Sequence, residues 1–389
     1  MKKIHLNQLL RNRAQFNGVG QLMNATHAIQ RALGMEPVAM PMASPMPTPA
    51  SAPTAAPMPH TSARWRGPAA NDVEDAVVVD RSPRPASAPS EPAQPAAQAA
   101  PVGEFTRIAL RHGPSVRHYK LFVPAAASAG TPLPLVVLLH GCTQNPDDFA
   151  AGTGMNTLAG QQGVLVLYPE QTQAGNTNHC WNWFRPEDQR RGSGEPALLA
   201  AMVRDAMQHH AVDPARIYVA GLSAGGAMAA VLGQQYPDLF AAVGVHSGLV
   251  AGGAHDVMSA FSAMKNGAKD QRNAPRPVSS VPTIVFHGDA DSTVHPRNGE
   301  QITEATTRYT PASALHSSTH QGTAPAGRSY TRTTHRSADG TVSTEQWTVH
   351  GSGHAWSGGK AAGSYTDPQG PDASAEMLRF FLAHPRKAG

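Results

Sequence analysis

A serine flanked by glycines and preceded by a short apolar run constrains this chain more than any other feature. The segment Gly221–Gly225 reads GLSAG, and the apolar run Ile217–Ala220 before it predicts a strand. The alanine-rich segment Ala224–Gln235 after it predicts a helix. On a tight strand-to-helix turn, larger neighbours of the serine would collide with the strand and the helix. We therefore predict that Ser223 is the nucleophile of a nucleophile elbow; the alternative is a glycine-rich turn without chemistry.

Further apolar runs place this turn in a larger sheet. Strands are expected at Phe105–Leu110, Arg117–Val123, Leu133–Leu139, Val164–Tyr168, Ile217–Ala220, Ala241–His246, Thr283–His287 and Glu345–His350. Helices are expected at Glu195–His210, Ala224–Gln235 and Ala373–Ala383. The first two strands alternate apolar and polar residues and read as a pair closed by Pro124, whereas the next two are continuous apolar runs that suit strands buried on both faces. Strands that alternate with helices indicate an α/β fold with a mostly parallel sheet and helices on both faces.

The serine hydroxyl needs a general base, because its own pKa leaves almost no alkoxide near neutral pH. In folds with such an elbow, the chain order is serine, then a carboxylate, then a histidine. Asp289 and Asp291 both follow the expected strand that begins at Thr283. From their position alone either can be the acid, and the other would brace the loop.

The histidine of this set is expected near the end of the chain. His354 follows the last expected strand and a Gly-Ser-Gly segment, which leaves its loop free to turn toward Ser223. The competing histidines are His287, His295 and His350. We predict that His354 is the general base; the alternative is a structural histidine in a loop.

An ester carbonyl that is attacked needs N–H donors about 2.7–3.1 Å from the oxyanion that develops. One donor is expected at the backbone of Ala224, next after the nucleophile, and the other on the loop after an early strand. The run Leu135–Leu139 leads directly into the sequence HGCTQ at His140–Gln144. The N–H group of Cys142 is therefore the second predicted donor, and its thiol is not needed as a nucleophile.

Charge and composition exclude several classes of function. The formal net charge is +4, but Lys and Arg are scattered and form no run that could grip a phosphate backbone, so no nucleic-acid partner is expected. No apolar segment approaches the roughly 18 residues that a transmembrane helix needs. The 19 histidines form no convincing pair at metal-ligand spacing, so neither a metal nor another cofactor is expected.

The first 100 residues differ in texture from the rest. Apolar residues recur at helical spacing over residues 4–33, which predicts one or two amphipathic helices in a segment 1–35. Such a stripe is a packing face or a contact to an apolar surface. Residues 36–100 are rich in Pro, Ala, Met and Ser and predict a disordered linker, so the catalytic domain is expected at residues 101–389. Near the N-terminus, polar residues interrupt the apolar stretch that a secretory signal peptide needs, which predicts a cytoplasmic protein.

Five blocks of the chain carry a resemblance to a known family. They are HGCTQ (His140–Gln144), CWNWF (Cys180–Phe184), GLSAGGAM (Gly221–Met228), HGDAD (His287–Asp291) and GHAWSGG (Gly353–Gly359). In this order they resemble the polyhydroxybutyrate depolymerase family of esterases, relatives of feruloyl and acetylxylan esterases, from about Phe105 to the C-terminus. The resemblance implies an α/β-hydrolase fold and the hydrolysis of carboxylic esters through an acyl-enzyme. It also implies that Asp291 is the acid of the triad and that Cys142 and Ala224 form the oxyanion hole.

The resemblance also narrows the substrate and the location. In secreted members of the family that this chain resembles, a signal peptide, a catalytic domain, a linker and a polymer-binding domain follow one another. This chain, in contrast, ends soon after its last expected helix. We therefore expect short-chain esters, 3-hydroxybutyrate oligomers or amorphous polymer as substrates, with an extracellular location left open by the resemblance. The alternatives are a feruloyl or acetylxylan esterase, and a granule-surface or lipid-surface binding protein that uses residues 4–33. Trp181, Trp183 and Trp356 are candidates for substrate contact, in an acyl pocket or a sugar platform, or for the core.

The two cysteines lie in two of these blocks. Cys142 and Cys180 each follow an early strand and flank a loop of the predicted site. In an oxidising compartment a disulfide would hold the oxyanion loop against Trp181–Phe184, whereas two free thiols are expected in the cytoplasm. The sequence leaves both alternatives open.

Overall fold

The computed structural model describes residues 103–125, 127, 130–269, 281–308 and 311–386. The predicted N-terminal segment at residues 1–35 and the predicted linker at 36–100 lie outside these residues, so both remain predictions, as does the domain boundary at residue 101. Within the described part, no helix is both long and apolar enough to cross a membrane.

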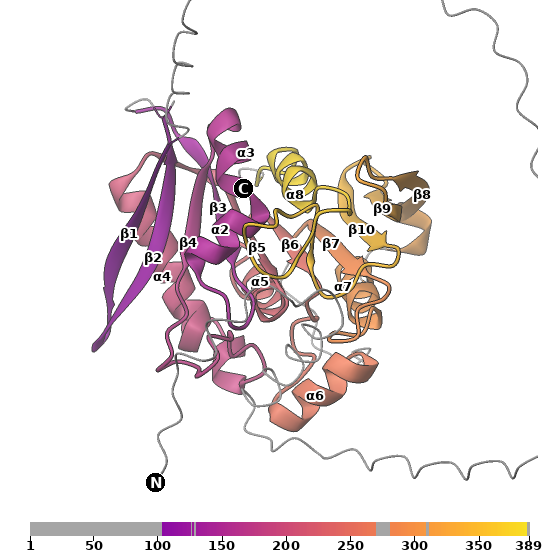
Figure 1. The fold of residues 1–389 in the computed structure, drawn as a ribbon, viewed down its shortest axis with the longest axis horizontal. Coiled ribbons are helices and arrows are strands. Elements are labelled where there is room, and N and C mark those ends of the chain that lie inside the picture. The colour runs from indigo at the N-terminus through magenta and orange to yellow at the C-terminus, as the bar shows by residue number, and fades with distance from the viewer. Residues whose placement is uncertain (1–102, 126, 128–129, 270–280, 309–310, 387–389) are drawn as a thin grey trace, which may run out of the picture. The chain divides into compact units, whose positions relative to one another are not determined.

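A ten-stranded sheet forms the centre of the described part of the chain (Figure 1). Its order is β1-β2-β4-β3-β5-β6-β7-β10-β9-β8. The strands are β1 (Gly103–His112), β2 (Ser115–Pro124), β3 (Leu133–Leu139), β4 (Leu165–Pro169), β5 (Val212–Leu222), β6 (Ala242–His246), β7 (Thr283–Gly288), β8 (Leu315–Thr323), β9 (Ser329–Ser337) and β10 (Val342–Val349). The six central strands are parallel, and antiparallel strands extend the sheet at both ends. The expected mostly parallel sheet is therefore confirmed.

Strand β3 shows why its sequence is continuously apolar. Leu135, Val137 and Leu139 point into one hydrophobic core, while Val136 and Leu138 point into a second core on the opposite face. All five side chains are completely buried. Because successive side chains of a strand alternate between faces, a strand covered on both faces needs apolar residues at every position.

Helices cover both faces of the sheet, as the sequence predicts (Figure 1). They are α2 (Pro146–Thr153), α3 (Met155–Gln162), α4 (Gly194–His209), α5 (Ala224–Gln235), α6 (Val257–Asn266), α7 (Arg297–Thr307) and α8 (Ala373–Leu382), with 3-10 turns η2 (Pro186–Gln189) and η3 (Ala312–Ala314). Leu198 of α4, Met228 of α5 and Ile302 of α7 belong to the same core as Leu135. Helices α2, α3 and α8 contribute to the opposite core. Two short strands, β11 (Trp356–Ser357) and β12 (Thr366–Asp367), pair separately.

Several elements are present that sequence reasoning did not predict, namely the hairpin β8–β9 and the helices α2, α3, α6 and α7. Strand β8 reads LHSSTHQGT, and almost all of its side chains are exposed. It has no apolar face that could reveal a strand, and it is held by its ladder to β9. Helix α7 is similarly hidden, because Ile302 is the single large apolar side chain that it buries.

The topology brings the predicted site residues to one edge of the sheet. Because the central strands are parallel, their carboxyl ends lie at the same edge, which is where α/β proteins bind ligands. Strand β3 leads to Cys142, β5 to Ser223, β7 to Asp291 and β10 to His354. Four segments that are distant in sequence thus converge at this edge.

Candidate active site

Ser223 occupies a strained turn between β5 and α5. Its backbone has φ 59° and ψ −119°, a conformation that is rare outside glycine and that is found at functional sites. A Cβ on Gly221 would lie 2.4 Å from the carbonyl carbon of Gly225, and a Cβ on Gly225 would lie 2.2 Å from the oxygen of Leu139. The glycines are therefore required by backbone crowding. The Ser223 N–H group donates to the His246 carbonyl at 2.9 Å, which ties the turn to β6.

Asp291 is completely enclosed and contacts His354. Its Oδ2 accepts from His354 Nδ1 at 2.7 Å, and its Oδ1 accepts from the backbone N–H groups of Thr293 and Val294, both at 2.9 Å. Burial alone would raise the pKa of Asp291, but His354 and His287 act against it and hold the pKa well below its ordinary value. The carboxylate is thus ionised and ready to stabilise a positive charge on His354.

The loop that carries His354 is braced from two sides. The carbonyl of Ser352 accepts from Ala290 N–H at 3.1 Å, which joins it to the loop of Asp291. The Ser352 hydroxyl donates to Asp367 Oδ2 at 2.6 Å, and Arg328 Nε donates to the same oxygen. Fixing the backbone next to His354 fixes the direction from which its ring approaches the sheet edge.

The competing residues have other partners. Asp289 accepts from His350 Nδ1 at 2.8 Å and from Gly351 N–H at 2.6 Å, so it braces the neighbouring loop. His287 lies 3.4 Å from Asp291 but donates from Nε2 to the Val294 carbonyl at 2.8 Å. The third competitor, His295, is exposed. The pair of Asp289 and His350 is partly exposed, whereas the pair of Asp291 and His354 is buried.

The two predicted oxyanion donors follow the adjacent parallel strands β3 and β5. Ala224 is the first residue of α5, and the first N–H groups of a helix have no acceptor within it. On the other loop, Gly141 N–H donates to Gln144 Oε1 at 2.9 Å and Thr143 N–H donates to the Asn178 carbonyl at 2.7 Å. Between them, Cys142 N–H donates to no other group of the described residues, so it is available to a ligand.

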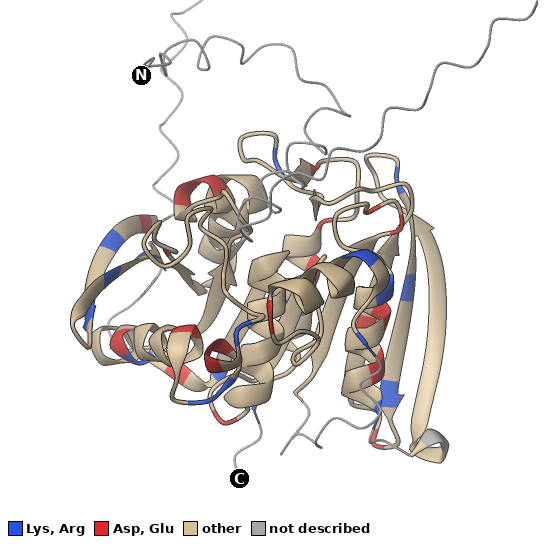
Figure 2. Cartoon of the chain, turned by 90° about the horizontal axis from the view of Figure 1, so that it is seen from below, with Lys and Arg blue, Asp and Glu red and all other residues tan. Residues whose placement is uncertain are grey.

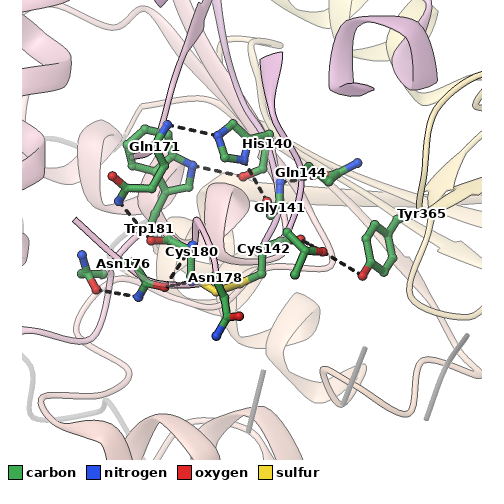
Figure 3. Close-up of a disulfide and its surroundings, with 12 residues drawn as sticks. His140, Gly141, Cys142, Gln144, Gln171, Asn176, Asn178, Cys180, Trp181 and Tyr365 are labelled. Carbon is green, nitrogen blue, oxygen red and sulfur yellow. Dashed lines mark hydrogen bonds between the residues drawn. A yellow bond between two sulfur atoms is a disulfide. The ribbon is translucent and has the colours of Figure 1, made fainter. Parts of the chain in front are cut away.

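A disulfide joins Cys142 and Cys180 (Figure 3). Of the two alternatives that the sequence leaves open, the structure therefore shows the bridge. Trp181 Nε1 donates to the His140 carbonyl at 3.0 Å, and Gln171 Nε2 donates to the Cys180 carbonyl at 3.0 Å. The bridge and these bonds hold the loop of Cys142 against the tryptophan segment.

A buried glutamate that sequence reasoning missed supports the same segment. Glu195 accepts from both the backbone and the side-chain nitrogen of Asn182 at 2.7 Å, and from Gln171 Nε2. Burial, together with the nearby charge of Asp188, raises the pKa of Glu195 to about 7. A glutamate in the first turn of a helix is ordinary in sequence, so nothing there distinguishes this one.

His246 was also missed, and it connects two parts of the site. Its carbonyl accepts from Ser223 N–H, while its Nε2 accepts from Ser357 N–H at 2.9 Å, three residues after His354. Complete burial and the neighbouring His287 and His354 hold the pKa of His246 well below its ordinary value, so its ring is neutral. A histidine at the end of an apolar strand carries no sequence signal for this role.

A narrow pocket opens beside Ser223. It holds about 370 Å³ of empty space, including the solvent at its mouth. Its lining is Cys142, Cys180, Trp181, Trp183, Phe184, Ser223, Ala224, Leu249, Met264 and Val294. Two of the three candidate tryptophans are thus brought to the pocket, which is otherwise almost entirely apolar.

Of the alternatives that the sequence leaves open for Trp356, the structure shows the core. Its ring is fully buried in the second core, where it packs edge-on against Phe149 and stacks on His246. Its Nε1 donates to Ser374 Oγ at 3.0 Å. Trp356 is not among the residues that line the pocket beside Ser223.

In the view of Figure 2, basic and acidic segments are interspersed over the described ribbon. Among the described residues, no group of three or more His, Cys, Asp or Glu side chains could hold a metal ion.

Comparisons with known proteins agree with the sequence resemblance. Residues 117–322 match the family described as Esterase PHB depolymerase. The chain is 34% identical over 246 residues to poly(3-hydroxyalkanoate) depolymerase C of Paucimonas lemoignei, covering 60% of this chain and 56% of that protein. It is 29% identical over 272 residues to the poly(3-hydroxybutyrate) depolymerase of Ralstonia pickettii, covering 66% and 55%. The chain therefore spans little more than half the length of these two relatives.

Two further comparisons concern esterases of other substrates. Feruloyl esterase B of Thermothelomyces thermophilus is 28% identical over 205 residues, with 49% of this chain and 69% of that protein covered. Among solved structures, the acetyl xylan esterase from Aspergillus awamori superposes with a TM-score of 0.56 at 20% identity, covering 72% of this chain and 100% of that chain. At this identity the likeness shows a shared fold alone.

Proposed function

The chain belongs to the polyhydroxybutyrate depolymerase family of esterases, with the α/β-hydrolase fold, and on this premise we propose that it hydrolyses carboxylic esters with Ser223 as nucleophile. The observation that carries this proposal is the bond between His354 Nδ1 and Asp291 Oδ2 at the sheet edge where β5 presents the serine. A proton held on Nδ1 by the carboxylate leaves Nε2 unprotonated, which is the form that a general base needs.

The reaction then proceeds through a covalent intermediate. Ser223 Oγ attacks the ester carbonyl carbon while His354 Nε2 takes its proton, and Asp291 stabilises the imidazolium that forms. The N–H groups of Cys142 and Ala224 donate to the oxyanion. His354 returns the proton to the leaving alcohol, which departs from an acyl-enzyme. Water, deprotonated by His354, attacks the acyl-enzyme and releases the carboxylic acid and free Ser223.

The pocket beside Ser223 supports short acyl groups as substrates. The pocket is narrow and lined almost entirely by apolar side chains, and none of the lining residues is charged. Pockets of this kind select a ligand by shape and by the few polar groups at one end, here the nucleophile and the N–H donors. We therefore propose 3-hydroxybutyrate esters, their oligomers, amorphous polymer or related short-chain esters as substrates.

A hydrolysis panel tests this assignment of substrate. The substrates are p-nitrophenyl esters of increasing acyl length, hydroxybutyrate oligomers, amorphous polymer and methyl ferulate. We expect kcat/KM to be highest for short acyl groups and hydroxybutyrate oligomers. Preference for methyl ferulate would instead favour the activity named for the feruloyl esterases. If none of these esters is hydrolysed, the proposed function is contradicted.

The domain arrangement is a further part of the proposal. Every residue with a proposed chemical role lies beyond residue 101, and the described sheet begins at Gly103. We propose that residues 101–389 are the catalytic domain and that residues 4–33 hold it near an apolar surface through the linker 36–100. Tethering of this kind raises the local concentration of substrate without altering the site.

A further inference from the structure

The lining of the pocket beside Ser223 indicates whether it receives the acyl group or the alcohol of the ester. The leaving alcohol must take a proton from the base, so it lies on the side of His354. The pocket lining includes Ser223 and both oxyanion donors, Cys142 and Ala224, whereas His354 is not among the residues that line it. The pocket therefore receives the acyl half. This inference rests on the proposed function, because it takes Ser223 as the nucleophile.

Half of the ten lining residues are bonded to other parts of the site or belong to the proposed chemistry. Cys142 and Cys180 are bonded to each other, and Trp181 is tied through Nε1 to the His140 carbonyl. Ser223 and Ala224 belong to the proposed chemistry. Changes at these positions would alter the oxyanion loop or the elbow together with the pocket.

Met264 differs from these residues because it lies on another element of the fold and has a flexible side chain. It comes from α6, which lies at the lower rim of the fold in Figure 1, beside α7. Its side chain is unbranched and can adopt several shapes, yet it is 8% exposed and closes one wall of the pocket. Met258 on the same helix is 65% exposed and is not part of the lining.

The backbone of Met264 is fixed to the loop that follows Asp291. His295 N–H donates to the Met264 carbonyl at 2.8 Å, and Asn298 Nδ2 donates to the Ala263 carbonyl at 2.9 Å. At its other end, a capping box between Asp256 and Ser259 stabilises the first turn of α6 itself. Because the backbone at Met264 is bonded to a neighbouring segment, a change of the side chain alters the depth of the pocket more than the position of the helix.

We propose that Met264 determines the length of acyl chain that the enzyme accepts. The side chain fills the volume into which a longer chain would extend beyond the carbonyl carbon at Ser223. Truncation to alanine removes the sulfur and the carbons on either side of it, which opens room for additional methylene groups. In an apolar pocket, one methylene changes kcat/KM by about tenfold or more.

The test compares ratios of kcat/KM measured on one enzyme sample. For p-nitrophenyl acetate, butyrate, hexanoate and octanoate, Met264→Ala should raise the octanoate-to-butyrate ratio at least about tenfold over the wild type. Met264→Phe should lower the hexanoate-to-acetate ratio. A ratio is independent of the amount of active enzyme, so a folding defect does not imitate the effect. Met258→Ala is the matched control on the same helix and should keep the wild-type ratios.

Several outcomes would overturn the proposal. Unchanged ratios in both Met264 variants would show that another residue limits the acyl chain. A shift in a series of acetate esters of increasing alcohol length, without a shift in the acyl series, would place the alcohol in the pocket. Ser223→Ala is measured on the same panel: if it keeps the activity, the proposed function fails and this inference fails with it. If activity depends on Ser223 but the ratios do not respond to Met264, this inference alone fails.

Discussion

His354 Nδ1 lies 2.7 Å from Asp291 Oδ2, although 63 residues separate the two in the sequence. Both side chains are almost completely buried, so the bond is shielded from water. A charge-assisted hydrogen bond is stronger in such a buried site than at the surface. Asp289 lies on the same loop but faces His350 and is partly exposed. The surroundings of the two carboxylates, and not their order in the chain, distinguish their roles.

This difference predicts unequal effects of two matched substitutions. Asp291→Asn should lower kcat on p-nitrophenyl butyrate by about 10⁴-fold, because an amide cannot stabilise the imidazolium and favours the wrong tautomer of His354. Asp289→Asn removes an exposed pair and should cost less than about tenfold, since such pairs contribute about 1 kcal/mol or less. Circular dichroism and Tm show whether both variants are folded. The reverse order of effects would transfer the acid role to Asp289.

The disulfide predicts the result of a thiol titration. The chain has two cysteines, and they are bonded to each other. Unfolded, unreduced protein should therefore show no reactive thiol, and reduced protein should show both. The bridge spans 38 residues of sequence, for which loss of loop-closure entropy predicts a stabilisation of about 3–4 kcal/mol. Two reactive thiols per chain without reduction would exclude the bridge.

Buried Glu195 predicts a pH trend in stability. Its pKa is raised from 4.5 to about 7 in the folded chain, so between these values the folded state holds a proton that the unfolded state has lost. The contribution of this group to the free energy of unfolding therefore falls as pH rises from 4.5 to about 7. Because Gln does not titrate, Glu195→Gln should gain stability relative to the wild type over that window.

Denaturant unfolding of the two proteins at several pH values measures this difference. Substitution of Gln for the exposed Glu187 provides a matched control on the neighbouring segment. A difference between wild type and Glu195→Gln that does not change with pH would contradict the raised pKa.

A truncation tests the proposed domain arrangement. A chain that starts near Pro101 should keep kcat/KM on a soluble short-chain ester within about threefold of the full chain, about 0.65 kcal/mol in barrier terms. Its activity on suspended polymer and its pelleting with polymer should fall further if residues 4–33 contact an apolar surface. Loss of turnover on the soluble ester, or an insoluble domain, would show that the N-terminal residues belong to the hydrolase core.

Sequence reasoning succeeded where a residue type is demanded by backbone geometry or by burial. The apolar run Leu133–Leu139 predicted a strand covered on both faces, and the predicted helix Ala224–Gln235 has the same bounds in the structure. The positions on either side of Ser223 require glycine because the backbone of β3 and α5 leaves no room for a Cβ.

It failed where partners distant in sequence decide the role of a residue. For Trp356, in a motif near His354, the sequence left substrate contact and the core open, and the ring packs in the core. Glu195 and His246 look ordinary in sequence, because their roles depend on N–H groups from other segments. The polar strand β8 carries no apolar alternation, so its pairing with β9 could not be read from its own residues.

Covalent labelling of the nucleophile tests the central claim most directly. An organophosphorus ester that traps activated serines should add one adduct per chain, on the peptide that contains Ser223, as measured by mass spectrometry. Ester hydrolysis should be lost in proportion to labelling, because each blocked serine removes one active site. Folded Ser223→Ala protein should neither be labelled nor hydrolyse the ester. An adduct on another residue, or hydrolysis that persists in fully labelled protein, would contradict the account.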